Sequence, residues 1–528
     1  MASSRLLSLL VIAFSGLLLI SLPNGTDSAK ILCLFSTASK SHVLGTQALL
    51  KHLAQRGHEV TMVSAFPLSK PVKNYRDVYV PIEDSFGPIM ASFMKGDSRN
   101  MLKIMPVITH ASLENTNFTL NSPQFQKLIK EEKFDVAILG FFMNDFVVGV
   151  RSWLNCPTIL YFSAGFSSMI NVVGNPTEIS AVPHLLLGNK NPMSFFDRVK
   201  NALIYTVDYV ITKFISYKTQ PYYDYNFPAE KGFPSYEEAK RNVSLVMFNS
   251  YFTQTVPRPY LPNMVEVGGL QIKSKPDPLP EDIQAWLDGA KDGAIFLSFG
   301  SNLKSSNLRQ DKFDAIIASL SKLKQRIIWK WDSEDMPSKP ANVMIGKWLP
   351  QDDILAHKNL KLFVTHGGLG SITESMYHGV PIVGMPMFGD QDTNVAQVVK
   401  EGWGASVSFD DITEQQLTGA IREVLENPKY AEQVQTMAAL YKDRPQSSMD
   451  LATYWVEYVI RHKGAPHLHY QGSDLNVLQR YLVDVMAFLG AAVFVALKVV
   501  GFALCRIKRM ICGGGQKKQK QKQKQKRH

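Results

Sequence analysis

Apolar and polar residues alternate in blocks along the first half of the chain, and the blocks have the lengths of strands and helices. Residues 31–35 form a short apolar run, and a pattern with helical spacing follows it and ends at Gly57. Apolar runs separated by amphipathic helices are typical of a parallel, doubly wound sheet. The runs that we predict to be strands in this half are residues 31–35, 58–64, 134–139 and 158–162.

A second series of the same kind begins at Ala294, after a segment rich in proline. Residues 256–282 contain six prolines and little periodicity, which is the composition of a linker. The sequence therefore predicts an α/β fold with two Rossmann-like domains facing across a cleft, where ligands bind at the carboxyl ends of the strands. The strands that we predict in the second series are residues 294–299, 326–331, 343–345, 361–365 and 381–384.

These patterns also set the predicted domain boundaries. We expect an N-terminal domain at residues 29–270, a linker at 271–282 and a second domain at 283–445, followed by a return helix and juxtamembrane segment at 446–484. Residues 183–214 mix apolar and charged side chains at helical spacing. They fit either the wall of an apolar pocket or ordinary amphipathic packing.

The chain begins with an apolar stretch that is typical of a targeting segment. Residues 6–22 are largely apolar and follow Arg5, and a polar stretch comes next. This order predicts a secretory signal peptide over residues 1–28, cut between Gly25 and Ala29. A first transmembrane helix is the alternative, but the apolar run is short and interrupted by serine and glycine.

A second apolar stretch, at residues 485–504, is long enough to cross a bilayer once. Lys498 lies near its end, so its ammonium group can reach the interface. Arg506, Lys508 and Arg509 follow at once and predict a cytosolic end. We therefore expect a single-pass type I protein with luminal domains and a basic cytosolic tail at 505–528.

The basic balance of the chain comes from this tail. Ten of the 57 Lys and Arg residues lie in residues 506–528, and the rest of the chain nearly balances the 46 acidic residues. The charge therefore indicates an anionic membrane face as partner and argues against nucleic acid. Lys524 and Lys526 resemble a dilysine signal for retrieval to the endoplasmic reticulum, and a solvated low-complexity run is the alternative.

Cysteines and sequons agree with a luminal location without proving it. Cys33 and Cys156 sit in apolar surroundings typical of strands or core, so no disulfide framework is predicted. The sequons at Asn117 and Asn242 predict a glycoprotein if those asparagines meet the glycosylation machinery.

The most specific pattern follows the predicted strand at 361–365. It reads His366-Gly367-Gly368-Leu369-Gly370-Ser371 and opens a helix that contains Glu374. Unpaired backbone N–H groups at such a turn attract a phosphate, and glycine lets the anion approach the backbone. A capping box of Ser371 and Glu374 would explain these two residues without any ligand.

Two further motifs lie on either side of this turn. Trp348-Leu349-Pro350-Gln351 offers an aromatic face beside an amide, although most tryptophans are core residues. Asp390-Gln391 pairs an acid with an amide, although Asp390 also fits the N-cap of the next helix. In this order the motifs resemble the signature of the family 1 UDP-glycosyltransferases, in the membrane-bound, insect-like animal form with the GT-B fold.

The resemblance implies a role for each motif residue. It implies a UDP-sugar as co-substrate, no tightly bound cofactor and no metal. The insect-like form favours UDP-glucose, while glucuronic acid and galactose stay open as donor sugars. The implied contacts are Trp348 and Gln351 on the nucleoside, Ser301, His366, Gly368, Gly370 and Ser371 on the diphosphate, Glu374 on the ribose, and Asp390 with Gln391 on the sugar.

His42 is the candidate general base, because a neutral imidazole suits this role near pH 7. It follows the first strand and opens a helix, and its Ser41-His42 context resembles the family motif. A structural histidine is the alternative.

The family's second catalytic residue is an acid whose aligned position here is Gly140. Either Asp145 replaces it or the protein works without it, and Asp145 could instead cap a helix.

Together these residues predict inverting transfer of a sugar from a UDP-sugar to a hydroxyl of a small lipophilic acceptor. The alternative is a membrane-tethered nucleotide-binding or regulatory subunit with little or no turnover, which the missing acid at Gly140 favours. A nucleotide-sugar epimerase fits the signal peptide and the membrane span less well. The sequence leaves the acceptor and the oligomeric state open.

Overall fold

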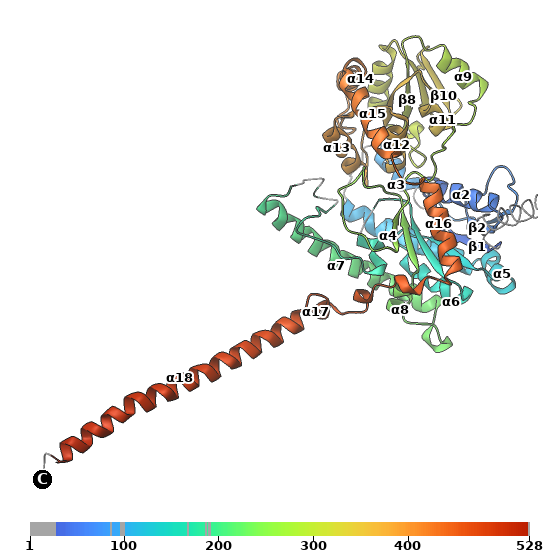
Figure 1. The fold of residues 1–528 in the computed structure, drawn as a ribbon. Coiled ribbons are helices and arrows are strands. Elements are labelled where there is room, and N and C mark those ends of the chain that lie inside the picture. Colours follow the sequence, from blue (N-terminus) through green and yellow to red (C-terminus); the bar gives the residue numbers. More distant parts are fainter. Residues whose placement is uncertain are drawn as a thin grey trace, which may run out of the picture. The chain divides into compact units, whose positions relative to one another are not determined.

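A computed structural model of the protein describes residues 28–84, 87–95, 101–165, 168–184, 187 and 192–525. The predicted signal peptide therefore lies outside the described residues, apart from Ser28. The described chain forms two compact units that divide after His469, and the first contains two parallel sheets (Figure 1).

The first sheet has seven strands in the order β3-β2-β1-β4-β5-β6-β7. All neighbouring strands are parallel, which is the doubly wound arrangement that the alternating pattern predicts. Its strands are β1 (Lys30–Leu34), β2 (Glu59–Ser64), β3 (Tyr75–Tyr79), β4 (Val136–Gly140), β5 (Thr158–Phe162), β6 (Leu245–Phe248) and β7 (Met264–Glu266).

The second sheet has six parallel strands in the order β10-β9-β8-β11-β12-β13. Two parallel α/β domains confirm the predicted fold class. The strands of the second sheet are β8 (Ala294–Ser298), β9 (Arg326–Lys330), β10 (Val343–Gly346), β11 (Leu360–Thr365), β12 (Ile382–Gly384) and β13 (Gly404–Ser406).

Helices cover both faces of each sheet, so the strands are nearly continuous apolar runs. In β1, for example, Leu32 and Leu34 join one core cluster while Ile31 and Cys33 join the cluster on the other face. The helices of the first half are α2 (Lys40–Gln55), α3 (Gly87–Lys95), α4 (Met101–Asn121), α5 (Pro123–Glu131), α6 (Val150–Leu154), α7 (Phe195–Asn226) and α8 (Tyr236–Arg241). Those of the second half are α9 (Glu281–Asp288), α10 (Gln310–Ser321), α11 (Gln351–Leu355), α12 (Leu369–His378), α13 (Gln391–Glu401), α14 (Glu414–Glu426), α15 (Pro428–Lys442) and α16 (Ser448–Arg461).

Every predicted strand is present, and the described residues contain four more strands that were missed. One of them, β7, lies inside the proline-rich residues 256–282, before the predicted linker at 271–282 and within the predicted N-terminal domain. Its three residues are held by pairing with the buried strand β6, which local composition does not reveal. The other missed strands are β3, β6 and β13.

Two helices pack on the sheet that is distant from them in sequence. Met90, Phe93 and Met94 of α3 belong to a core cluster of the second domain, and Phe93 stacks on Phe388 with ring centroids 4.9 Å apart. In the other direction, α16 packs its apolar face into the core beside β1 and α2. The two domains are therefore tied together by exchanged helices.

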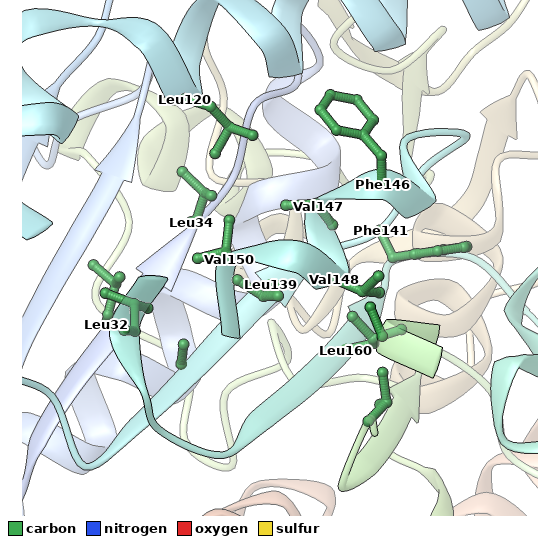
Figure 2. Close-up of a cluster of buried hydrophobic side chains, with 14 of the residues drawn as sticks. Leu32, Leu34, Leu120, Leu139, Phe141, Phe146, Val147, Val148, Val150 and Leu160 are labelled. Carbon is green, nitrogen blue, oxygen red and sulfur yellow. The ribbon is translucent and has the colours of Figure 1, made fainter. Parts of the chain in front are cut away.

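The core beneath the first sheet supports the loops after β1 and β4. Figure 2 shows Leu34 and Leu139, near the ends of these strands, beside Phe146 and Val147 of the short helix η1 (Asp145–Gly149). Because these side chains are almost fully buried, the carboxyl ends of β1 and β4 are held firmly relative to each other. Gly140 is the last residue of β4, and His42 lies in the helix α2 that follows β1.

The second unit contains the predicted membrane span. Helix α18 (Val483–Gln525) includes Val483–Ile511, which is long and apolar enough to cross a bilayer and is the one such helix in the described part of the chain. The predicted span at 485–504 lies within it. The short helix α17 (Val477–Arg480) precedes it.

Candidate active site

His42 lies in the first turn of α2, directly after β1, as the sequence predicts. Its ring packs edge-on against Phe142 with centroids 4.8 Å apart. Burial lowers the pKa of His42 to about 4, so the imidazole is neutral near pH 7. Its Nδ1 atom is buried and has no hydrogen-bond partner among the described residues.

The glycine-rich turn connects β11 to α12 and depends on glycine for steric reasons. Gly367 has a φ of 84°, and a Cβ atom on Gly368 would lie 2.7 Å from His366 Nε2. Helix α12 begins at Leu369 with Gly368 as its N-cap, and no side chain caps it. The capping-box interpretation of Ser371 and Glu374 was therefore wrong, because both residues lie inside the helix.

Gln351, Ser371 and Glu374 form one polar cluster, in which Ser371 and Glu374 are buried and Gln351 is half-buried. Gln351 Nε2 donates to Glu374 Oε2 at 2.6 Å and lies 3.2 Å from Ser371 Oγ. The other carboxylate oxygen accepts from Gln271 Nε2 at 3.2 Å. Burial raises the pKa of Glu374 to about 7, although these amide bonds oppose the shift.

His366 faces the loop after β8. A Cβ atom on Gly300 would lie 2.7 Å from its ring, so this loop passes very close to the imidazole. Burial and the nearby Lys330 ammonium lower the pKa of His366 to about 4. Lys330 Nζ donates to the Gly300 carbonyl at 2.6 Å, which places a cation beside the turn. Ser301 follows in the same loop, half-buried.

Asn394 holds Asp390 against the same turn, and the backbone holds the neighbouring Gln391. Asn394 Nδ2 donates to Asp390 Oδ2 at 2.8 Å and to the Gly367 carbonyl at 3.0 Å. Asp390 occupies the N-cap of α13, but its side chain makes no capping bond. Gln391 Oε1 accepts from the backbone N–H groups of Met387 and Phe388.

Trp348 and the start of α2 meet at the boundary between the two domains. The Trp348 side chain is 54% exposed, so the core interpretation was wrong. Lys40 Nζ lies 3.7 Å from the centre of its ring, a cation–π contact. Next to it, Ser39 Oγ donates to Asn302 Oδ1 at 3.0 Å. These contacts bring the His42 turn of the first domain to the glycine-rich loops of the second.

The structure does not bring Asp145 to His42. Asp145 is the first residue of η1, and this element packs on α7 and α8. Burial raises the pKa of Asp145, and the Tyr236 hydroxyl and the Lys240 charge oppose that shift. The carboxylate therefore faces α7 and α8, because Thr219 belongs to α7 and Tyr236 and Lys240 belong to α8. Asn144 precedes it without capping η1.

Helix α7, which overlaps residues 183–214, leaves several of its apolar side chains exposed. Phe196, Leu203, Val207 and Phe214 are all more than half exposed. Residues 185, 186 and 188–191 lie outside the described part of the chain.

Several residues of this arrangement were missed by sequence reasoning. Their side chains are common polar types, and only their neighbours in space mark them. Asn302 follows the identified Ser301, and Lys40 precedes the identified Ser41-His42 pair. This proximity in sequence was the one signal that could have pointed to them. The missed residues are Lys40, Gln271, Asn302, Lys330 and Asn394.

The fold and the family can now be compared with known proteins. The solved structure of Arabidopsis thaliana UGT89C1 matches 82% of this chain and all of that chain with a TM-score of 0.54, at 16% sequence identity. This likeness shows two-domain GT-B architecture. The family model described as UDP-glucoronosyl and UDP-glucosyl transferase matches residues 29–519, and the chain belongs to that family.

Relatives in this family carry different donor names. UDP-glucosyltransferase 2 of Dactylopius coccus is 34% identical over 92% of this chain and 93% of its own length. UDP-glucuronosyltransferase 2B17 of Rattus norvegicus is 30% identical over 85% of this chain and 88% of its own length. The protein is thus a UDP-glycosyltransferase that transfers a sugar from a UDP-sugar. In the described residues, no group of three or more His, Cys, Asp or Glu side chains could hold a metal ion.

Proposed function

We propose that this enzyme transfers glucose from UDP-glucose to a hydroxyl of a small lipophilic acceptor, with inversion and with His42 as general base. The observation that carries the proposal is the pair of contacts Ser39–Asn302 and Lys40–Trp348. They hold the helix start that carries His42 against the loops that we assign to UDP-glucose. The name of the Dactylopius coccus relative supports glucose as the donor sugar.

The proposed reaction is a single displacement. Because His42 Nδ1 is buried, Nε2 is the nitrogen that meets the acceptor. It takes the proton of the acceptor hydroxyl while that oxygen attacks the anomeric carbon from the face opposite UDP. The bond from the anomeric carbon to the β-phosphate oxygen breaks, and UDP leaves with the electron pair.

We assign the departing diphosphate to the start of α12. The N–H groups after Gly368 have no side-chain cap, so they and the helix dipole can stabilise the charge that develops on UDP. His366, Gly370, Ser371 and Ser301 border this position. Lys330 lies behind the Gly300 loop and adds positive potential.

We assign the nucleoside and the sugar to the clusters on either side. Trp348 stacks on uracil in this proposal. Because the Lys40 ammonium covers one face of the Trp348 ring, either Lys40 moves away from that face or uracil stacks on the opposite face. Gln351 binds the nucleoside and Glu374 accepts from the ribose hydroxyls. Asp390 and Gln391, anchored by Asn394 and the backbone, bind the hydroxyls of glucose.

The proposal extends to the membrane of the endoplasmic reticulum. The apolar helix α18 and the basic residues after it support a single span with a cytosolic tail. Both catalytic domains would then be luminal.

His42→Ala tests the assigned base. The variant should lower kcat by about 10²–10⁴-fold, because a general base contributes that much, and should still bind UDP. His52→Ala, at the far end of the same helix, is the control and should keep full activity. An unchanged kcat in His42→Ala would show that another group takes the proton.

A nucleotide-binding or regulatory subunit remains the second candidate, because His42 has no carboxylate partner among the described residues. Membranes containing the full chain should be incubated with labelled UDP-glucose, UDP-glucuronic acid and UDP-galactose and with a panel of phenols, quinones and steroids. Transfer of glucose supports the enzyme. UDP binding without transfer of any sugar would support the subunit.

A further inference from the structure

The aligned position for an orienting acid, Gly140, has no room for a side chain. A Cβ atom added to Gly140 would lie 2.6 Å from two carbon atoms of the Phe35 ring. Phe35 is itself 4% exposed and packed in the core, so it has little freedom to move aside. The ring therefore fills the volume that a carboxylate on residue 140 would need.

A small cavity lies beside this ring, and His42 lines it together with Ser36, Thr116, Gly140 and Asn144. The space open to the centre of a water molecule is about 10 Å³, which is close to the minimum for one buried water. The buried Nδ1 atom of His42 has no partner among the described residues. A cavity of this size, with hydroxyl and amide groups in its lining and an unpaired nitrogen beside it, has room for one water molecule.

The hydroxyls at this cavity have a defined direction of hydrogen bonding. Thr116 Oγ1 donates its one proton to the Ser112 carbonyl at 2.8 Å. Its 2.6 Å contact with Ser36 Oγ therefore requires Ser36 to be the donor. The Ser36 oxygen then keeps a lone pair with which it can accept a proton from a neighbour.

Asn144 holds the two hydroxyls in this arrangement. Its Nδ2 donates to Thr116 Oγ1 at 3.0 Å, and its Oδ1 accepts from the Phe142 N–H at 2.7 Å. Both acceptor and donor atoms of the amide are thus used, and its orientation is set by the backbone. Asn144 and Thr116 are each almost fully buried.

We propose that Ser36, Thr116 and Asn144 orient His42 through one water molecule in this cavity, in place of the family's acid. The inference rests on the proposed role of His42 as base. The water accepts the Nδ1–H of His42 and donates to Ser36 Oγ. The Ser36 hydroxyl in turn donates to Thr116 Oγ1, and Thr116 donates to the Ser112 carbonyl. This selects the tautomer whose Nε2 lone pair faces the acceptor. The three residues are positioning residues and exchange no proton with the substrate.

A neutral network differs from a carboxylate in what it does for the histidine. It can hold the ring and the tautomer, but it carries no charge to stabilise an imidazolium. Loss of the network should therefore affect the step in which the acceptor proton moves, and it should leave substrate binding unchanged.

The test uses the full-length enzyme in membranes with UDP-glucose and one accepted acceptor. Ser36→Ala and Thr116→Val should each lower kcat by about 10-fold or more while KM for both substrates changes by less than about two-fold. Thr116→Ser, which keeps the hydroxyl, should retain most of kcat. The double variant should lose little more than Ser36→Ala alone, because both residues belong to one chain of hydrogen bonds.

Thr109→Val is the matched control. Thr109 lies on the same helix as Thr116, is also buried, and donates to the carbonyl four residues earlier at 2.8 Å, but it does not line the cavity. It should keep the wild-type kcat. A purely structural role would give equal losses in both Thr→Val variants and additive losses in the double variant, and either result would overturn the proposal.

The outcomes also separate this inference from the proposed function. If His42→Ala abolishes transfer while Ser36→Ala and Thr116→Val keep the wild-type kcat, His42 remains the base and the network plays no part. If Ser36→Ala raises KM for the acceptor without lowering kcat, the cavity binds the acceptor and the assigned water is wrong. If His42→Ala itself keeps the wild-type kcat, His42 is not the base, and the proposed network has no histidine to orient.

Discussion

Glu374 is a buried carboxylate whose two oxygens both accept from amides, Gln351 on one side and Gln271 on the other. Amide donors stabilise the ionised form, yet burial outweighs them and raises the pKa to about 7. A ribose hydroxyl can donate to an ionised carboxylate more strongly than to a carboxylic acid. The protonation of this one group should therefore control nucleoside binding near neutral pH.

We predict that uridine, which carries no phosphate to titrate, binds more tightly as pH rises from 6 to 8. Burial keeps Glu374 largely protonated in the folded protein until the pH approaches 7, whereas an ordinary exposed glutamate ionises near pH 4.5. Below pH 7 affinity should fall by up to about tenfold per pH unit. Calorimetric or NMR titration at several pH values measures this. Glu374→Gln should remove the slope, and a slope that persists in the variant would assign it to another group.

Single residues also show where sequence patterns are ambiguous. Ser371 and Glu374 match a capping box in spacing, but the helix begins at Leu369 and both side chains turn to Gln351 instead. Asp145 is the nearest acid to Gly140 in sequence, yet its short helix turns the carboxylate toward α7 and α8. Spacing along a chain does not define direction in space, so neither outcome was readable from the residues alone.

At the scale of elements, most of the predicted strands were recovered because they are apolar runs buried on both faces, and β10, at a sheet edge, is the least buried of them. Three of the missed strands are short or polar, whereas β6 is a buried apolar run of four residues that the pattern did carry and that was overlooked. In β3, the sequence Tyr-Arg-Asp-Val-Tyr is only partly buried at the sheet edge, and β7 and β13 have three residues each. Such strands are held by their neighbours' hydrogen bonds, which have no local signature.

Helix α3 illustrates an element whose role depends wholly on tertiary packing. Phe93 is 1% exposed and stacks on Phe388 of the second domain with an interplanar angle of 5°. We predict that Phe93→Ala lowers the free energy of unfolding by about 3–5 kcal/mol, because it leaves a cavity between the domains.

Thermal unfolding of the purified enzyme, followed by circular dichroism, measures this loss. Phe118→Ala is the control, since Phe118 is 54% exposed on α4, and its melting temperature should match the wild type. Equal melting temperatures in all three proteins would mean that α3 does not stabilise the second domain.

At the scale of the whole molecule, the described residues form two separate compact units that divide after His469. The first contains both sheets, α16 and every residue assigned to the site. We predict that the enzyme truncated after His469 stays in solution without detergent and binds UDP as the full chain does, because it loses the apolar helix α18 but no site residue. Membrane sedimentation and UDP titration of both proteins measure this. A truncated protein that still sediments with membranes would show a second membrane-binding surface.

The sequence by itself determined the two α/β domains, the apolar span, and the motifs that mark the family, because burial on both faces of a sheet and close approach to a phosphate each demand particular residue types at local spacing. Only the tertiary structure decided which polar side chains meet. Three examples are the contact of Gln351 with Glu374, the contact of Asn394 with Asp390, and the packing of the Phe35 ring against Gly140. In each case the residue types are compatible with many other partners. Packing selects one partner, and packing is a property of the folded chain.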